Sequence, residues 1–120
     1  KNKNNGTKKE VIVEAATRLF REKRFKAASL RDLAEAVGVE AASLYNHIQS
    51  KEELLQEICF KVANDFNQKC DEIENGNLST IKRVEAMLRF HIRMMFDHYE
   101  MVIVADRDWK FQGRKLGKRV

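Results

Sequence analysis

Residues 40–47 bring together side chains whose chemistry suits nucleic acid. The amide of Asn46 can form two hydrogen bonds with the edge of an adenine, and the methyl group of Ala41 or Ala42 can contact that of a thymine. The polar groups suited to phosphate oxygens belong to Ser43, Tyr45 and His47. We therefore predict that this segment contacts DNA.

Two further helix starts carry residues that we predict to contact the DNA backbone. Ser29 begins one helix and supplies a hydroxyl group, and Arg31 lies in the first turn of the same helix. Lys51 lies at the start of another helix, where unpaired N–H groups and the positive end of the helix dipole favour phosphate.

Two short helices joined by a glycine must position these residues. Ser29 and Asp32 fit a capping box, which opens a helix whose apolar residues face inward. Gly38 follows and can adopt the left-handed conformation of a sharp turn. The second short helix, residues 40–47, points Leu44 inward. Packed on a longer first helix, such a pair forms a helix-turn-helix unit, whose second helix enters the major groove.

The rest of the chain also shows helical periodicity, which predicts an all-α fold. A first helix spans residues 7–23, and a long one spans 51–72. After a turn at Gly76, another long helix begins at Ser79, and its pattern is lost beyond Asp106. One face of this last helix carries Ile81, Val84, Leu88, Ile92, Met95 and Tyr99.

The net charge of +5 is unevenly distributed. Residues 1–51 contain eleven Lys and Arg against six Asp and Glu, a surplus of five, whereas residues 52–108 contain seven against twelve, a deficit of five. Residues 109–120 add five basic residues and no acid. A basic first half favours a polyanionic partner, because binding to phosphates releases their counterions.

Several classes of protein are disfavoured by composition. Cys59 and Cys70 are too few for a disulfide scaffold and lack the spacing of a metal site. Apolar runs are too short to cross a membrane, and the polar start does not resemble a signal peptide. We therefore predict a cytoplasmic location, no membrane contact, no metal and no cofactor.

The spacing of the motifs closely resembles the tetracycline-repressor-like family of bacterial transcriptional regulators. The resemblance covers about residues 8–60 without a gap. It is carried by Ala15-Ala16-x-x-Leu19-Phe20, Ser29-x-x-Asp32-Leu33-Ala34-x-x-Val37-Gly38-Val39, Ser43-Leu44-Tyr45-x-His47 and Ser50-Lys51-Glu52-Glu53-Leu54.

This resemblance implies a homodimer that binds a palindromic DNA operator through residues 1–50, which include a short basic N-terminal arm. It also implies a helical region, residues 51–120, that binds a small effector and mediates dimerisation. Members of the family usually have a longer C-terminal domain, so we expect an incomplete one here.

Four positions depart from the family pattern. Arg24 stands where the family usually has the glycine that ends the first helix. Ala42 replaces a common glycine, Ile48 a common aromatic residue, and Glu40 a common serine or threonine. Glu40 could cap its helix or accept a hydrogen bond from cytosine. These changes affect the base contacts more than the fold.

The resemblance also places an effector pocket in the second region. Phe90, His91 and Met94 are the predicted lining residues, because methionine and aromatic side chains fit irregular apolar cavities and an imidazole can orient a polar group. The alternative is that these residues form a solid core.

Two functions from different classes remain open. We favour a repressor that is released from DNA by a small, largely apolar effector and that is associated with the nucleoid when bound to DNA. The alternative is a DNA-bound adaptor that recruits another protein without a ligand switch. An enzyme is disfavoured, because His91, Asp97 and His98 are the only candidates for a catalytic set and no glycine-rich phosphate loop is present.

Overall fold

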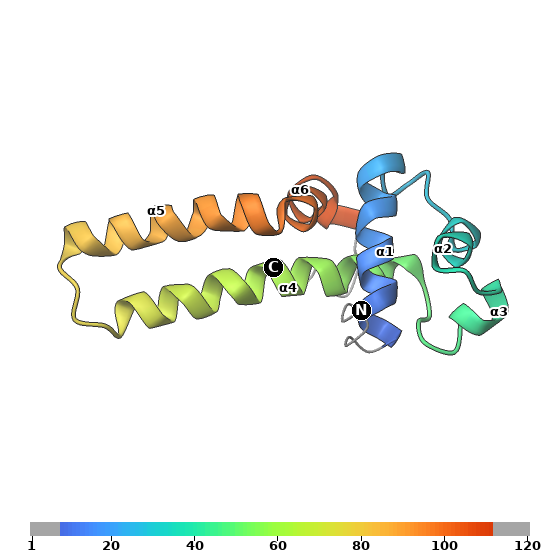
Figure 1. The fold of residues 1–120 in the computed structure, drawn as a ribbon, viewed down its shortest axis with the longest axis horizontal. Helices are drawn as coiled ribbons and strands as arrows, with labels where there is room; N and C mark the ends of the chain where they lie inside the picture. Colours follow the sequence, from blue (N-terminus) through green and yellow to red (C-terminus); the bar gives the residue numbers. More distant parts are fainter. Residues whose placement is uncertain (1–7, 112–120) are drawn as a thin grey trace.

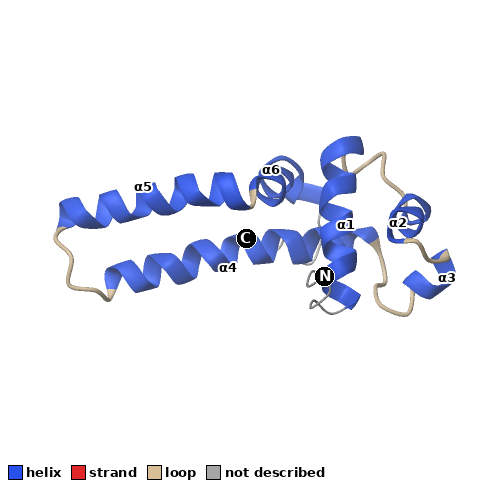
Figure 2. Ribbon diagram, viewed as in Figure 1, coloured by secondary structure: helices blue, strands red, loops and turns tan. Residues whose placement is uncertain are grey.

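A computed structural model describes residues 8–111 of the chain, and this part is helical, with no strand (Figures 1 and 2). The α-helices are α1 (Lys8–Lys23), α2 (Leu30–Val37), α3 (Ala41–Leu44), α4 (Lys51–Glu74), α5 (Thr80–Asp97) and α6 (Tyr99–Asp108), followed by the 3₁₀ turn η2 (Trp109–Phe111). The predicted all-α class is confirmed. The basic arm, Thr7 and residues 112–120 lie outside the described residues.

The described part is elongated, measuring 53 × 40 × 23 Å (Figure 1). Helices α2 and α3 lie at one end. Helices α4 and α5 run side by side in opposite directions and form the other end, and α6 crosses between them and α1 (Figure 1).

A single cluster of buried side chains joins the helix-turn-helix to the helices that follow. Ile12 and Phe20 of α1 are almost fully buried, as are Leu33 of α2 and Leu44 of α3. The same cluster includes Leu54, Leu55 and Ile58 of α4 and Val104 of α6. Each such side chain stabilises the fold by about 1.5–3 kcal/mol. The core therefore continues across residue 50, the predicted domain boundary.

Serine caps begin three of the helices. The Ser29 hydroxyl accepts from the Asp32 N–H at 3.0 Å, and the Ser29 N–H donates to the Asp32 carboxylate at 3.1 Å, as the predicted capping box requires. Ser50 and Ser79 likewise accept from backbone N–H groups three residues later. Each cap stabilises its helix by about 1 kcal/mol.

Arg24 adopts a left-handed backbone conformation, with a φ of 73°. Its N–H donates to the Phe20 carbonyl at 2.9 Å and so ends α1, and its own carbonyl accepts from Ala28 at 3.2 Å. An L-residue in this region is strained by roughly 1–2 kcal/mol relative to glycine. The backbone thus has the geometry of a glycine cap although the residue is arginine.

The last long helix differs from the prediction in two ways. It breaks at His98, with φ −135° and ψ 38°, and α6 begins a new direction there. In addition, its predicted apolar face points to solvent: Ile81 is 74% exposed, and Val84, Leu88 and Ile92 are each more than half exposed. The opposite face, which includes Met94, packs on α4 instead.

Among residues 8–111, no helix combines the length and the apolar character needed to cross a membrane.

Candidate nucleic-acid interface

The turn between α2 and α3 is built on Gly38. Its φ of 87° and ψ of 29° are left-handed, and its N–H donates to the Ala34 carbonyl at 2.8 Å. The Val39 N–H donates to the same carbonyl at 3.0 Å. These two hydrogen bonds to the last turn of α2 accompany a sharp change of chain direction. The buried Leu44 then anchors α3 against the core.

Helix α3 is shorter than the predicted helix 40–47. Regular helix ends at Leu44, and the residues after it continue as turns. The backbone N–H of Asn46 donates to the Ser43 carbonyl at 3.1 Å, and that of His47 donates to the Leu44 carbonyl at 2.9 Å. The glutamate before it, Glu40, is exposed, and its side chain makes no capping bond.

The predicted DNA-contacting residues of this segment share one exposed surface. Leu44 and Ile48 turn inward, whereas the residues between and before them are exposed. The exposed set is Ala41, Ala42, Ser43, Tyr45, Asn46 and His47. The structure therefore brings all six predicted contacts together at one end of the molecule, where α3 lies (Figure 1).

Lys8 belongs beside this surface, although it was not among the contacts predicted from the sequence. It lines a small depression of about 130 Å³ together with Ser43, Asn46 and His47. Its position in the first turn of α1 places a cation beside the residues that are predicted to contact DNA. The available signal was its place at the start of α1, directly after a basic arm.

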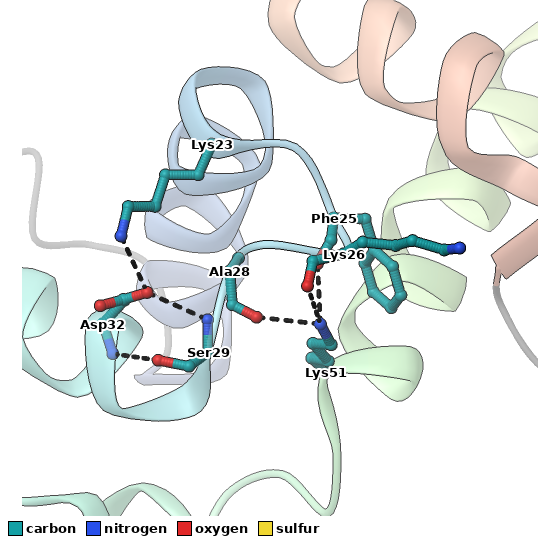
Figure 3. Close-up of polar contacts among 7 residues, drawn as sticks. All are labelled: Lys23, Phe25, Lys26, Ala28, Ser29, Asp32 and Lys51. Atoms are coloured by element: carbon teal, nitrogen blue, oxygen red, sulfur yellow. Dashed lines mark hydrogen bonds and ion pairs between the residues drawn. The ribbon is translucent and has the colours of Figure 1, made fainter.

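Ser29 and Arg31 lie exposed at the start of α2. The Ser29 hydroxyl oxygen accepts from Asp32, which leaves its proton available to a phosphate. Asp32 is also paired with Lys23 at 3.2 Å (Figure 3). Hydrogen bonding from Lys23 and from Ser29 lowers the pKa of the Asp32 carboxyl, so the cap stays ionised at neutral pH.

Lys51 is placed differently from the other predicted contacts. Its ammonium group donates to the backbone carbonyls of Phe25 at 2.8 Å, Ala28 at 2.9 Å and Lys26 at 3.4 Å (Figure 3). It also lies 4.4 Å from the centre of the Phe25 ring. The predicted phosphate contact of this side chain therefore competes with bonds inside the protein.

Glu53 completes the junction between α1, the loop before α4, and α4. Its carboxylate accepts from the Gln49 N–H at 2.7 Å and from Lys9 of α1 at 3.2 Å. The Gln49 hydrogen bond is the main cause of a lowered pKa for Glu53, and Lys9 lowers it further. Charge pairing thus joins α1 and α4, the helices on either side of α2 and α3.

The three predicted effector residues do not form one site. His91 lines an apolar groove of about 610 Å³ between α4, α5 and α6. Phe90 and Met94 instead line a smaller depression of about 300 Å³ beside charged residues of α4, and Met94 is only 5% exposed. The other residues of the apolar groove are Cys59, Val62, Ala63, Phe66, Met95, Val102, Ile103, Ala105, Asp106 and Trp109.

Helix α6, which lines this groove, is bonded to α1 at both of its ends. Arg107 donates to the Phe20 carbonyl at 2.6 Å and pairs with the buried Asp108 carboxylate through two hydrogen bonds of 2.9 and 3.0 Å. At the other end, Arg21 donates to the Tyr99 hydroxyl at 3.2 Å. A displacement of α6 would therefore act directly on the last turn of α1.

Two features of the described residues bear on catalysis and metal binding. Burial, with a smaller contribution from the Asp108 carboxylate, raises the pKa of the Cys59 thiol to about 11, so it is protonated at neutral pH and a poor nucleophile. Within residues 8–111, no three His, Cys, Asp or Glu side chains lie close enough together to hold a metal ion.

Comparison with known proteins identifies the helix-turn-helix. The profile of "Bacterial regulatory proteins, tetR family" matches residues 12–58, which run from α1 into α4. The chain is also 36% identical over 83 residues to "HTH-type transcriptional repressor KstR2" of Rhodococcus jostii (strain RHA1), a match that covers 69% of this chain and 40% of the relative. Residues 12–58 match the helix-turn-helix region of the tetR family.

Solved structures of tetR-type regulators share the fold. The structure of KstR2 from Mycobacterium tuberculosis matches with a TM-score of 0.82 at 21% identity, covering 86% of this chain and 53% of that one. The structure of AibR "in complex with isovaleryl coenzyme A and operator DNA" matches with a TM-score of 0.70 at 26% identity, covering 82% and 54%. The chain spans about half the length of the tetR-family proteins it matches.

Proposed function

We propose that this protein is a DNA-binding transcriptional repressor that binds a palindromic operator as a homodimer and is released by a small, largely apolar compound. The observation that carries the proposal is the shared exposed surface of α3 and the turn after it, at the end of a tetR-family helix-turn-helix. The name of the KstR2 relative, a transcriptional repressor, supports the direction of regulation. The role is non-enzymatic, and a regulator of bacterial DNA works in the cytoplasm, associated with the nucleoid when bound.

The proposed operator contacts divide into two kinds. Asn46 and the methyl groups of Ala41 and Ala42 contact base edges. Phosphate contacts come from Ser29, Arg31, Ser43, Tyr45 and His47, with Lys8 added from the geometry. Two copies of the unit on one palindrome would double these contacts and make affinity strongly dependent on operator symmetry.

The proposed effector site is the apolar groove between α4, α5 and α6. Its volume of about 610 Å³ is within the range of small-molecule pockets, and His91 and Asp106 supply polar groups at an otherwise apolar surface. Since α6 also contacts α1 through Arg107, a ligand that shifts α6 would alter the placement of the DNA-facing end. This groove favours a ligand-controlled repressor over the adaptor.

Binding of the protein to DNA should weaken steeply as salt rises. The surplus of five positive charges over residues 1–51 and the proposed phosphate contacts require counterion release. A titration of a mixed-sequence duplex between low and physiological salt should give a straight line of negative slope for log K against log salt concentration. A flat line would contradict the proposed DNA binding.

An effector in the groove should change the fluorescence of Trp109, the single tryptophan of the chain, and lower operator affinity about 5- to 150-fold. Ketosteroids are the probes, because they are largely apolar and are named for the KstR2 structure. Ala63→Phe, which fills the groove, should abolish the response. Asn64→Phe adds the same ring at the next, exposed position outside the groove and should retain it.

One result would contradict the proposed location of the effector site. If a compound releases the protein from operator DNA while Trp109 fluorescence stays constant and Ala63→Phe responds normally, the effector binds elsewhere. If operator DNA is bound and none of the probes affects it, the adaptor becomes the better description.

A further inference from the structure

The contacts of Lys51 suggest a role other than the phosphate contact predicted for it. We propose that Lys51 is a positioning residue for DNA binding: its ammonium group ties the loop between α1 and α2 to the start of α4 and supports operator affinity without contacting phosphate. This inference rests on the proposed DNA binding but concerns how one residue serves it.

The ammonium group of Lys51 has its hydrogen-bonding capacity used inside the protein. It has three N–H donors and no acceptor. Three backbone carbonyls surround it, those of Phe25 and Ala28 at 2.8 and 2.9 Å and that of Lys26 at 3.4 Å (Figure 3). A phosphate could recruit this group only by breaking these bonds.

The Phe25 ring fixes the ammonium group from another side. The Nζ atom of Lys51 lies 4.4 Å from the ring centre, within the range of a cation–π contact. The ring itself is buried and packs against Phe20 of α1 at 5.2 Å and stacks on Phe111 of η2 at 5.7 Å. The Lys51 side chain is therefore attached to a rigid part of the core and cannot swing freely towards DNA.

A positive charge at the first position of α4 is otherwise unfavourable. The N-terminus of a helix carries the positive end of its dipole, so a cation there is repelled. The carbonyl oxygens of the loop supply compensating negative charge directly at Nζ, and Glu52 and Glu53 add acidic residues in the same turn. Internal partners thus explain why a lysine is stable in this place.

The loop that Lys51 holds leads directly into the DNA-facing start of α2. It begins at Arg24, whose left-handed backbone is strained, and ends at Ala28. Ser29, the cap of α2, follows directly, and Arg31 lies in the first turn of α2. Removing the tether would let this loop open and displace the start of α2 relative to α4. Affinity would fall because the phosphate contacts of α2 are misplaced.

The test separates positioning from charge by measuring the salt dependence of binding. The variants are Lys51→Met, which keeps the aliphatic stem but removes the donors, and Arg31→Met as the matched control for a phosphate contact. The probe is an operator duplex selected with the unaltered protein from a random-sequence pool. Hydrogen exchange of the backbone amides of Ala28 and Asp32 is measured without DNA.

Lys51→Met should weaken operator binding about tenfold, the effect of losing roughly one charged hydrogen bond, with an unchanged salt slope. The amides of Ala28 and Asp32 should exchange about tenfold faster in the same variant. Arg31→Met should instead reduce the salt slope by about one and leave the exchange rates unchanged.

A reduced salt slope for Lys51→Met with unchanged amide exchange would overturn the proposal and restore the phosphate contact. Should Lys51→Met lower Tm too far for binding measurements, Lys51→Gln provides a neutral donor, and the same two readouts decide. If the unaltered protein binds no DNA, the proposed function fails, whereas the exchange measurement still tests the tether by itself.

Discussion

Gly38→Val should lower the free energy of unfolding by about 2 kcal/mol or more and abolish operator binding at physiological temperature. The backbone of Gly38 has a φ of 87°, where an L-residue is strained by about 1–2 kcal/mol and a β-branched residue by more. Chemical denaturation in urea gives the change in free energy, and circular dichroism gives the change in Tm.

Two control variants isolate the cause of this effect. A Cβ atom at Gly38 would meet no atom within 4 Å, so Gly38→Ala measures backbone strain without a clash and should be destabilising by about 1–2 kcal/mol. Gly76 lies in the turn between α4 and α5, and a Cβ there would make only ordinary contacts at 3.5 and 3.6 Å. Gly76→Val should be the milder change. Equal stability of Gly38→Val and the unaltered protein would contradict the role of this turn.

Asn46→Ala should relax discrimination at one base pair in each operator half-site by about 1–3 kcal/mol, a change of roughly 5- to 150-fold. The side chain is exposed in the turn after α3, with Lys8 and His47 lining the same depression. Affinities for operators with each base pair substituted in turn would show the position that loses its preference.

The matched control for Asn46→Ala is Ser43→Ala. It removes a polar group that lines the same depression but is predicted to contact phosphate rather than a base. It should weaken all operators to a similar degree and leave base preference intact. If Asn46→Ala also weakens all operators equally, this amide does not contact a base edge.

The starts of the helices could be predicted from the sequence because the signals are local. Ser29 with Asp32 and Ser50 with Glu53 contain their caps within four residues, and Gly38 marks the one described glycine with a left-handed backbone. The exposed side of α3 followed from the same local information, since Leu44 faces the core and defines the opposite side.

The contacts made by distant residues could not be predicted in this way. The spacing of Ile81, Val84 and Leu88 showed an apolar face but not the direction in which α5 presents it, and that direction depends on how α5 packs on α4. The break at His98 involves neither proline nor glycine. As a result, the part of α6 and η2 that lines the groove, including Ile103 of α6 and Trp109 of η2, was not recognised.

Lys51 illustrates the same limit at one residue. Its place at a helix start suggested a phosphate contact, but the carbonyls that bind its ammonium group lie 23 to 26 residues earlier in the chain. A rule based on neighbours in the sequence has no access to partners at that separation.

The left-handed backbone at Arg24 has a consequence for how relatives of this chain are found. What the end of α1 requires is a conformation, and the bonds from Arg24 to Phe20 and from Ala28 to Arg24 maintain that conformation around a residue that does not prefer it. A search pattern that demands glycine at this position would reject the present sequence although the backbone fits. Patterns for such junctions should therefore allow unbranched residues there and exclude valine, isoleucine and threonine, whose Cβ branching makes this conformation least accessible.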